Sequence, residues 1–248
     1  LAGLLILSLG ACGQQNDSKN SVQNEPASSK QVEQSSTRKE RRSSEASSSD
    51  DSDKSTKKAG EVTVDKGVSF NGSYYSVQGK SGDIVIANKH YPLAADYNPG
   101  EDPTAVAALH ELIAAMQAEG YAISDQYSGF RSYETQVDLY QSYVNKDGVA
   151  AADRYSARPG YSEHQTGLAF DLIDTSGNLV QEAGASKWLL KNAAKYGFIV
   201  RYQEGKEAST GYMPESWHLR YIGEDAKDVA ASGKSLEEYF NFTGGDYE

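Results

Sequence analysis

One short apolar stretch with an aspartate near its centre constrains this chain more than any other part of it. Residues 168–173 read Leu-Ala-Phe-Asp-Leu-Ile, and their alternation predicts a short buried strand with Leu168, Phe170 and Leu172 on one face. Asp171 then lies on the opposite face, within an otherwise apolar run. A buried carboxylate needs a partner of opposite charge, and a metal ion is one such partner. The stretch therefore predicts a strand that can present a metal ligand.

Two of the four histidines in the chain stand close to carboxylates. His164 precedes Asp171 by seven residues, and Gly167 between them allows a tight turn through which the two side chains can converge. His218 belongs to a second strand pattern over residues 217–222, and Glu215 falls in the turn before that strand. The two segments thus repeat one combination of imidazole and carboxylate.

Two imidazoles and one carboxylate form a ligand set that suits zinc, and catalytic zinc sites keep a fourth position open for water. His164, Asp171 and His218 would supply the three ligands, which leaves Glu215 beside the metal but not bound to it. The alternative is that each histidine and its carboxylate form a hydrogen-bonded structural pair. Spacing alone does not decide between these two readings.

The pattern Ser-x-His-x-x-Gly-x-Ala-x-Asp over residues 162–171, followed by Glu-x-Trp-His over residues 215–218, resembles the signature of the zinc D-alanyl-D-alanine carboxypeptidases of the VanY type. The resemblance implies an α+β fold, with helices packed on a small, mostly antiparallel sheet that carries a Zn²⁺ site. It implies His164, Asp171 and His218 as metal ligands and Glu215 as the catalytic base. The implied partners are D-Ala-terminated stem peptides of peptidoglycan.

A strand pattern that ends near residue 127 runs through Ser-Gly-Phe-Arg-Ser into a helix with Ser132 as its predicted N-cap. The start of a helix favours anions, so Arg131 could bind a peptide carboxylate there; an ordinary surface ion pair is the alternative. In the family that the sequence resembles, this arginine holds the terminal carboxylate of the substrate. By the same resemblance, Gln136 and Ser162 would hydrogen-bond the substrate.

The resemblance is strongest to the lipoprotein L,D-carboxypeptidases of this family, which trim the last D-Ala from tetrapeptide stems. D,D-carboxypeptidase action on pentapeptide stems is the second possibility, because the residues quoted do not define the subsite before the cut. A zinc-containing binding module without catalysis, and a stem-peptide endopeptidase, are further alternatives. Retention of Glu215 argues against the binding module, and Arg131 argues against the endopeptidase.

Charge and composition divide the chain of 248 residues into unlike parts. Residues 13–60 contain nine Lys and Arg and eight Asp and Glu with almost nothing to bury, which predicts a disordered tether. Residues 61–248 contain fifteen basic and twenty-seven acidic residues, a balance that argues against nucleic acid as a partner. We expect a small β hairpin over 61–82 and the carboxypeptidase domain over 83–243.

The single cysteine, Cys12, excludes an internal disulfide. It follows the apolar residues 1–11, which end in Leu-Gly-Ala, and this arrangement is typical of the end of a bacterial lipoprotein signal peptide. Residues 1–12 are therefore interpreted as the remnant of that peptide, with Cys12 lipidated. The expectation is a monomer anchored by lipid to the outer face of the bacterial cell membrane.

The rest of the chain predicts helices and strands and offers few further candidates for functional residues. His90 is interpreted as structural or exposed, and His110 as a structural histidine beside the apolar stripe of its helix. Tyr202 either lines the substrate cleft or packs in the core. Residues 203–213 are predicted to form a mobile loop. The remaining elements expected are a hairpin over 68–77, strands over 83–88, 121–127 and 198–202, and helices over 102–120, 150–155 and 186–196 and from residues 132, 225 and 235.

Overall fold

The computed structural model describes residues 64–247. Cys12 and the predicted tether over 13–60 lie outside these residues, and so does the beginning of the predicted hairpin segment. Within the described part, none of the helices combines the length and the apolar character that crossing a membrane requires.

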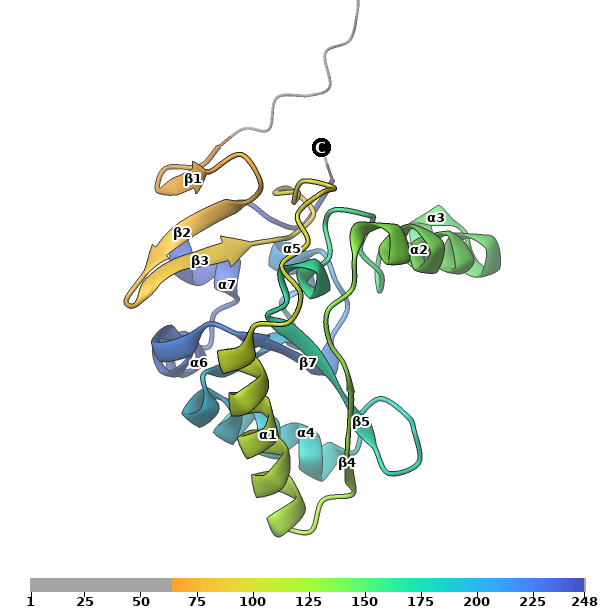
Figure 1. The fold of residues 1–248 in the computed structure, drawn as a ribbon, viewed down its shortest axis with the longest axis vertical. Coiled ribbons are helices and arrows are strands. Elements are labelled where there is room, and N and C mark those ends of the chain that lie inside the picture. Colours follow the sequence, from red (N-terminus) through yellow and green to blue (C-terminus); the bar gives the residue numbers. More distant parts are fainter. Residues whose placement is uncertain (1–63, 248) are drawn as a thin grey trace, which may run out of the picture. The chain divides into compact units, whose positions relative to one another are not determined.

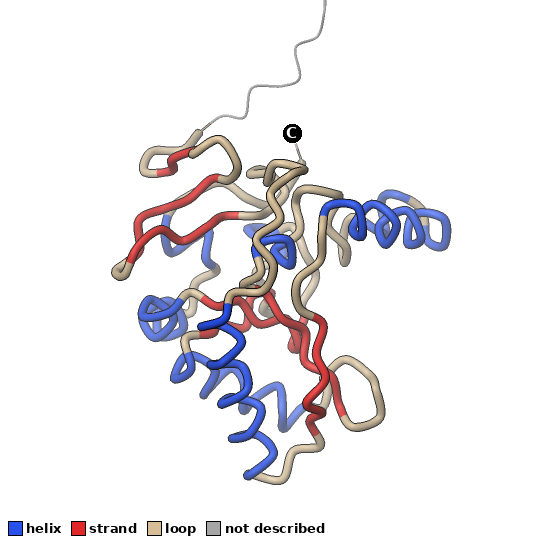
Figure 2. The backbone as a smooth tube through the Cα atoms, viewed as in Figure 1, coloured by secondary structure: helices blue, strands red, loops and turns tan. Residues whose placement is uncertain are grey.

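Within residues 64–247, seven strands form two antiparallel sheets (Figures 1 and 2). The first sheet has the order β1-β2-β3 and the second the order β4-β5-β7-β6. The strands are β1 Val68–Phe70, β2 Tyr75–Gly79, β3 Gly82–Ile86, β4 Ile123–Ser128, β5 Ala169–Asp174, β6 Phe198–Tyr202 and β7 Glu215–Tyr221. The predicted hairpin around Asn71 and Gly72 is thereby confirmed, and it continues into a third strand that pairs with β2.

Helices lie beside the sheets and form part of several connections between strands (Figure 1). The α-helices are α1 Pro103–Ala118, α2 Tyr133–Asp147, α3 Val149–Ala152, α4 Ala183–Asn192, α5 Glu207–Thr210, α6 Ala226–Ser232 and α7 Leu236–Phe240. The described part of the chain also contains the short 3₁₀ helices η1 Glu163–Thr166, η2 Ala193–Tyr196 and η3 Gly223–Asp225. The predicted α+β class, with helices on small antiparallel sheets, is confirmed.

The ends of several helices lie where the sequence predicts them. Asp102 accepts a hydrogen bond from the backbone N–H of Ala105 at the start of α1, and Ser132 accepts one from Thr135 at the start of α2. Ser235 and Glu238 form the expected capping box of α7. These side chains satisfy backbone N–H groups that the first turn of a helix leaves without a partner.

Three expectations need correction. Glu215 is the first residue of β7, paired with Tyr202 of β6, and does not lie in the preceding turn. Helix α4 begins at Ala183, three residues before the predicted start, because the carboxylate of Glu182 accepts hydrogen bonds from two N–H groups of its first turn. The segment 203–213 contains α5 and the buried Tyr212, so it is not the simple loop that its polar composition predicts.

The two faces of the four-stranded sheet differ in the side chains that they bury. One face packs against α1 and α4 in the largest hydrophobic core, where Leu112, Phe170, Leu189 and Leu219 are fully buried. The opposite face carries the alternate residues of the same strands, including charged side chains that are also buried. Successive side chains of a strand point to opposite faces, so one strand can contribute apolar residues to the core and charged residues to the other side. The functional site lies on the charged face.

Candidate metal centre and active site

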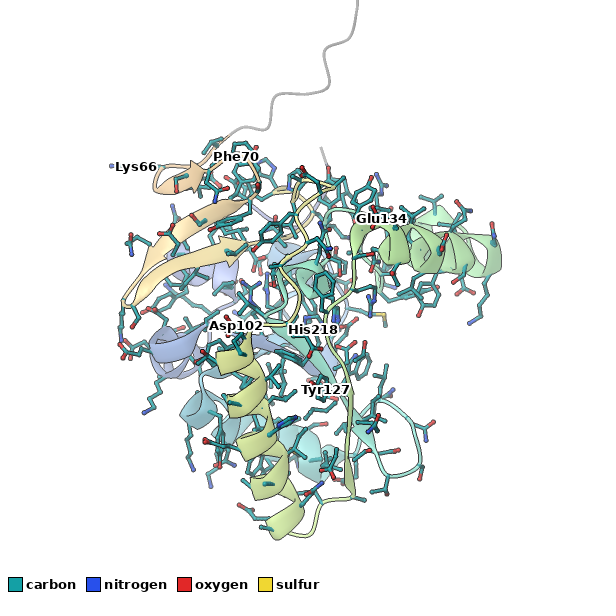
Figure 3. The ribbon with its side chains drawn as sticks, in the orientation of Figure 1. Lys66, Phe70, Asp102, Tyr127, Glu134 and His218 are labelled. Atoms are coloured by element: carbon teal, nitrogen blue, oxygen red, sulfur yellow. The ribbon has the colours of Figure 1, made fainter. Side chains whose placement is uncertain are left out.

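Asp171 and His218 are brought together by strand pairing. The antiparallel pair β5·β7 places them directly opposite each other, so their side chains emerge on the same face of the sheet. His218 lies in the interior of the domain, whereas Lys66 and Glu134 point outward (Figure 3). The position of two predicted ligands therefore follows from the strand register.

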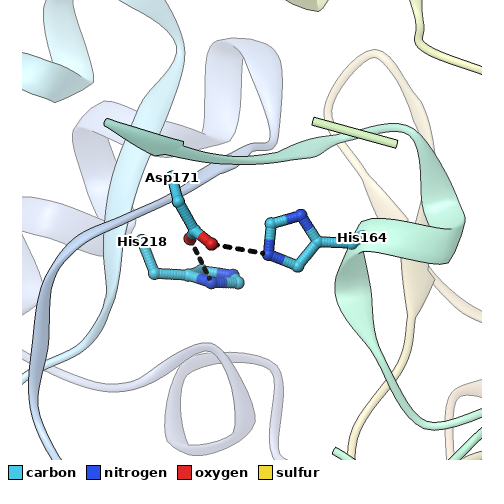
Figure 4. Close-up of side chains that lie close together, drawn as sticks. All are labelled: His164, Asp171 and His218. Atoms are coloured by element: carbon cyan, nitrogen blue, oxygen red, sulfur yellow. Dashed lines mark ion pairs between the residues drawn. The ribbon is translucent and has the colours of Figure 1, made fainter. Parts of the chain in front are cut away.

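The third predicted ligand, His164, lies on η1, immediately before β5. Gly167 ends η1 in the left-handed conformation with φ 72°, and a Cβ atom there would lie 1.9 Å from the carbonyl oxygen of Gly100. A glycine is required on both counts, since a side chain would be strained and would collide with backbone. The tight turn inferred from the sequence is thus what returns His164 toward Asp171 (Figure 4).

The ligand atoms of these three side chains lie within 4.8 Å of one another (Figure 4). Asp171 Oδ2 is 3.2 Å from His164 Nε2, and Asp171 Oδ1 is 3.1 Å from His218 Nδ1. Despite that proximity, Asp171 Oδ1 is buried and makes no well-directed hydrogen bond within residues 64–247. A buried carboxylate whose two oxygens each face one imidazole nitrogen fits a metal ligand.

The outward ring nitrogens of both histidines have hydrogen-bond partners. His164 Nδ1 lies 2.7 Å from the carbonyl oxygen of Gly129, and His218 Nε2 lies 3.2 Å from Glu163 Oε2. The two nitrogens that face Asp171, Nε2 of His164 and Nδ1 of His218, are those that would bind a metal. Metal-binding histidines usually donate their other N–H to a carbonyl or carboxylate, so both contacts fit zinc.

The electrostatics of the pocket favour a positive charge. Burial lowers the pKa of His218, but the close carboxylates of Asp171 and Glu163 outweigh burial and raise the pKa to about 10. Burial would raise the pKa of Asp171, yet the two histidines hold it well below its usual range. A buried position that is surrounded by ionised carboxylates is a favourable environment for a divalent cation.

Glu215 lies at the edge of this cluster, with Oε2 3.6 Å from His218 Nδ1. Burial raises the pKa of Glu215 to about 8; nearby Asp171 and Glu163 add to the rise, while His218 and Arg131 oppose it. A carboxylate with a pKa near neutrality can both accept and return a proton, which is the property that a general acid–base catalyst needs.

Arg131 reaches the same cleft from the segment between β4 and α2. Its Nη1 donates to Gln136 Oε1 at 2.9 Å, its Nη2 lies 3.3 Å from Ser128 Oγ, and its backbone N–H donates to the carbonyl of His164. Burial lowers the pKa of its guanidinium, although Asp171 and Glu215 act in the opposite direction. The guanidinium is thus held in place near the predicted metal ligands and forms part of the cleft wall.

The other predicted substrate contacts differ in position. Ser162 and Tyr202 line the cleft, and the Tyr202 ring lies 4.8 Å from that of His218. Gln136 is 1% exposed, and its amide nitrogen donates to the carbonyl of Ala157 while its oxygen accepts from Arg131. Substrate binding by these residues stays a prediction, and for Gln136 the geometry favours support of Arg131.

The cleft has a volume of about 300 Å³ and includes residues that the sequence analysis did not single out. Glu163 is the most consequential, and its place between Ser162 and His164 in the motif was the available signal. Aromatic and aliphatic side chains complete the walls: Leu139, Tyr143, Tyr155, Leu179, Tyr212 and Trp217. A larger hollow of about 760 Å³ near η2 and η3 contains none of the predicted site residues.

The chain is similar to known proteins. A sequence profile of the family VanY, described as D-alanyl-D-alanine carboxypeptidase, matches residues 100–224. The putative carboxypeptidase YodJ of Bacillus subtilis is 36% identical over 190 residues, which cover 66% of this chain and 69% of that protein. The expected resemblance is therefore confirmed over most of the described part.

Two solved structures are also similar to this chain. The L,D-carboxypeptidase DacB of Streptococcus pneumoniae is 68% identical with a TM-score of 0.71, over 73% of this chain and 98% of the chain in that structure. A substituted form of the D,D-pentapeptidase VanY from a VanB-type resistance cassette, solved with Zn(II), is 32% identical with a TM-score of 0.55, over 63% of this chain and 97% of that one. Zinc is thus the metal that the His–Asp–His cluster fits. Motif, site geometry and overall similarity agree, and the chain belongs to the VanY family of D-alanyl-D-alanine carboxypeptidases.

Proposed function

We propose that this protein is a zinc-dependent L,D-carboxypeptidase, which removes the C-terminal D-Ala from the tetrapeptide stems of peptidoglycan. The observation that carries the proposal is that Arg131, Glu215 and the three predicted metal ligands all line one cleft. The choice of L,D over D,D specificity is supported by the 68% identity to the solved chain of the L,D-carboxypeptidase DacB, 98% of which the match covers. Removal of a single terminal residue suits an enzyme of cell-wall remodelling.

The cleft arrangement accounts for cleavage one residue from the end of a peptide. Arg131 would bind the free carboxylate of the terminal D-Ala, for which the planar guanidinium is well suited. The peptide bond just before that carboxylate would then lie beside Glu215 and the metal ligands. An internal peptide bond brings no carboxylate to Arg131, so the proposal is for an exopeptidase.

Bound at His164, Asp171 and His218, zinc supplies a Lewis acid that polarises the scissile carbonyl and lowers the pKa of water. Glu215 takes a proton from the attacking water and passes it to the nitrogen of the departing D-Ala. The C–N bond breaks as the water oxygen becomes part of the new carboxylate, and Glu215 is left ionised for the next cycle.

The proposal is tested on muropeptides with tetrapeptide and pentapeptide stems, analysed by mass spectrometry with and without a chelator. Loss of one alanine from tetrapeptides, abolished by the chelator, supports L,D-carboxypeptidase action. Loss only from pentapeptides would assign D,D specificity instead. Absence of cleavage of either stem by zinc-loaded protein would favour a binding module.

We also propose that the protein acts outside the cytoplasm as a monomer, attached to the bacterial membrane through a lipid on Cys12. The support is the Leu-Gly-Ala-Cys sequence and the polar segment that follows it. Metabolic labelling with a radioactive fatty acid tests the anchor. Label should enter the unaltered precursor and be absent from a Cys12→Ser precursor; equal labelling of both would exclude Cys12 as the attachment point.

A further inference from the structure

Glu163 stands between the predicted metal centre and a buried pair of arginines. Its side chain is 1% exposed. Oε1 accepts hydrogen bonds from Arg201 Nε at 2.8 Å and Arg220 Nη1 at 2.9 Å. Oε2 faces His218 Nε2 at 3.2 Å. The carboxylate therefore has one oxygen held by two cations and the other directed at the ring of a predicted zinc ligand.

The two arginines are themselves fixed in position. Arg201 makes a bidentate ion pair with Glu237 of α7, with distances of 2.8 and 2.5 Å. Arg220 donates through Nη2 to the carbonyl oxygen of Val85 in β3 at 2.6 Å. All of these side chains are buried. Because each guanidinium is held from a separate element, Glu163 has little freedom to rotate away from His218.

We infer that Glu163 is a positioning residue for zinc binding, which holds the Nε2–H of His218 and thereby directs Nδ1 of that ring to the metal. The inference rests on the proposed metal centre and adds to it a requirement for one tautomer of His218. With a metal on Nδ1 in place of a proton, the anchored carboxylate would keep the remaining proton of His218 on Nε2 and so hold the Nδ1 lone pair toward the metal. Glu163 is thus assigned to holding a metal ligand in position, a role that its contact with His218 carries.

A matched pair of substitutions separates this role from general support of the fold. Glu163→Gln keeps the size of the side chain but removes the charge next to His218. Glu237→Gln makes the same change in the same buried network, on a side chain that contacts Arg201 and not His218. Both substitutions disturb buried ion pairs, so both should lower stability.

Zinc affinity, measured by competition with a chromogenic chelator, should fall about 10- to 100-fold in Glu163→Gln and stay within about twofold of the unaltered protein in Glu237→Gln. The visible spectrum of the Co²⁺-loaded protein should change only in Glu163→Gln, because that spectrum reports ligand geometry. Equal losses of affinity in both variants, or none in either, would overturn the inference.

A measurement on the unaltered protein keeps the inference testable if Glu163→Gln does not fold. Long-range ¹H–¹⁵N NMR of the zinc-loaded protein should show His218 with its proton on Nε2 and the metal on Nδ1. A metal on Nε2 would contradict the inference. None of these measurements uses a substrate, so they can fail while the proposed L,D-carboxypeptidase activity stands, and the reverse also holds.

Discussion

Asp171 and His218 form a directly opposed pair on the adjacent antiparallel strands β5 and β7, and their side chains meet with Asp171 Oδ1 3.1 Å from His218 Nδ1. The backbone hydrogen bonds of the sheet thus set the separation of two metal ligands. A shift of one residue in the register would move either ligand to the opposite face, against α1 and α4. The stability of the sheet and the geometry of the site are therefore linked.

Loss of the Asp171 charge should abolish zinc binding. In Asp171→Asn the size of the side chain is kept, but the neutral amide is a poor metal ligand. We expect the zinc content of the purified protein to fall from about one per chain to near zero, with loss of activity, as measured by atomic absorption. Asp138→Asn, on the exposed side of α2, is the control and should retain both. A variant of Asp171 that keeps stoichiometric zinc would remove this residue from the ligand set.

Loss of the Glu215 carboxylate should stop turnover while zinc stays bound. Glu215→Gln removes the group that we assign to proton transfer but leaves His164, Asp171 and His218 in place. The expected fall in kcat is about 10²- to 10⁴-fold, the usual contribution of a positioned general base. Activity is measured on tetrapeptide stems and zinc by atomic absorption. Near-normal kcat at full zinc occupancy would show that another group moves the proton.

Replacement of Arg131 by lysine should impair both binding and orientation of the substrate. Lysine keeps the charge but loses the planar pair of donors that grips a carboxylate. We expect kcat/KM to fall about 100-fold, with KM raised and kcat lowered, since a small misplacement of the bond to be cut is costly. Arg154→Lys, an exposed residue paired with Glu207, is the control. An unchanged KM in Arg131→Lys would argue against carboxylate binding at this position.

Ionised Asp153 should stabilise the folded protein, and this contribution to the free energy of unfolding should be lost in acid. Burial raises the pKa of Asp153, but hydrogen bonds from Arg158 and Tyr140 outweigh burial and bring the pKa below its usual 3.8. A folded-state pKa below the unfolded one means that the stabilisation is present above pH 3.8 and is lost as the pH falls through the lowered value. Because Arg158 is 41% exposed, we expect a contribution of about 1 kcal/mol or less.

Urea unfolding of the unaltered protein and of Asp153→Asn at several pH values checks this prediction. The unaltered protein should be the more stable of the two at pH 7, and the difference should shrink steadily below pH 4. A difference that stays constant down to pH 2 would mean that ionisation of Asp153 is not its origin.

Short-range features of the sequence predicted much of this structure. Side-chain caps such as Asp102 and Ser132 act within three residues of their partners, so the helix starts could be located from the sequence. The start of α4 was misplaced because Glu182 is an unusual cap, and its two hydrogen bonds to the first turn are visible only in three dimensions. The alternation in β5 predicted which of its faces is apolar, and the structure agrees.

The metal ligands could be predicted because they belong to a sequence motif that is recognisable from residue types and spacing alone. The partners of Glu163 could not be predicted in the same way. Arg201 and Arg220 lie 38 and 57 residues away along the chain, and only the pairing of β6 with β7 brings them to one carboxylate. Gln136 illustrates the same limit, since its contact with Ala157 depends on how the segment after α3 returns to α2.

The buried arginines limit how far the chain can be truncated without loss of stability. The segment that matches the VanY profile, residues 100–224, includes Arg201 and Arg220 but excludes Val85 and Glu237, to which they donate. A fragment trimmed to the family boundaries would leave two guanidinium groups without those partners, at a cost of several kcal/mol, comparable to the whole stability of a domain. The small N-terminal sheet and the last helix are thus integral to the catalytic unit, and a shorter enzyme would need both arginines redesigned.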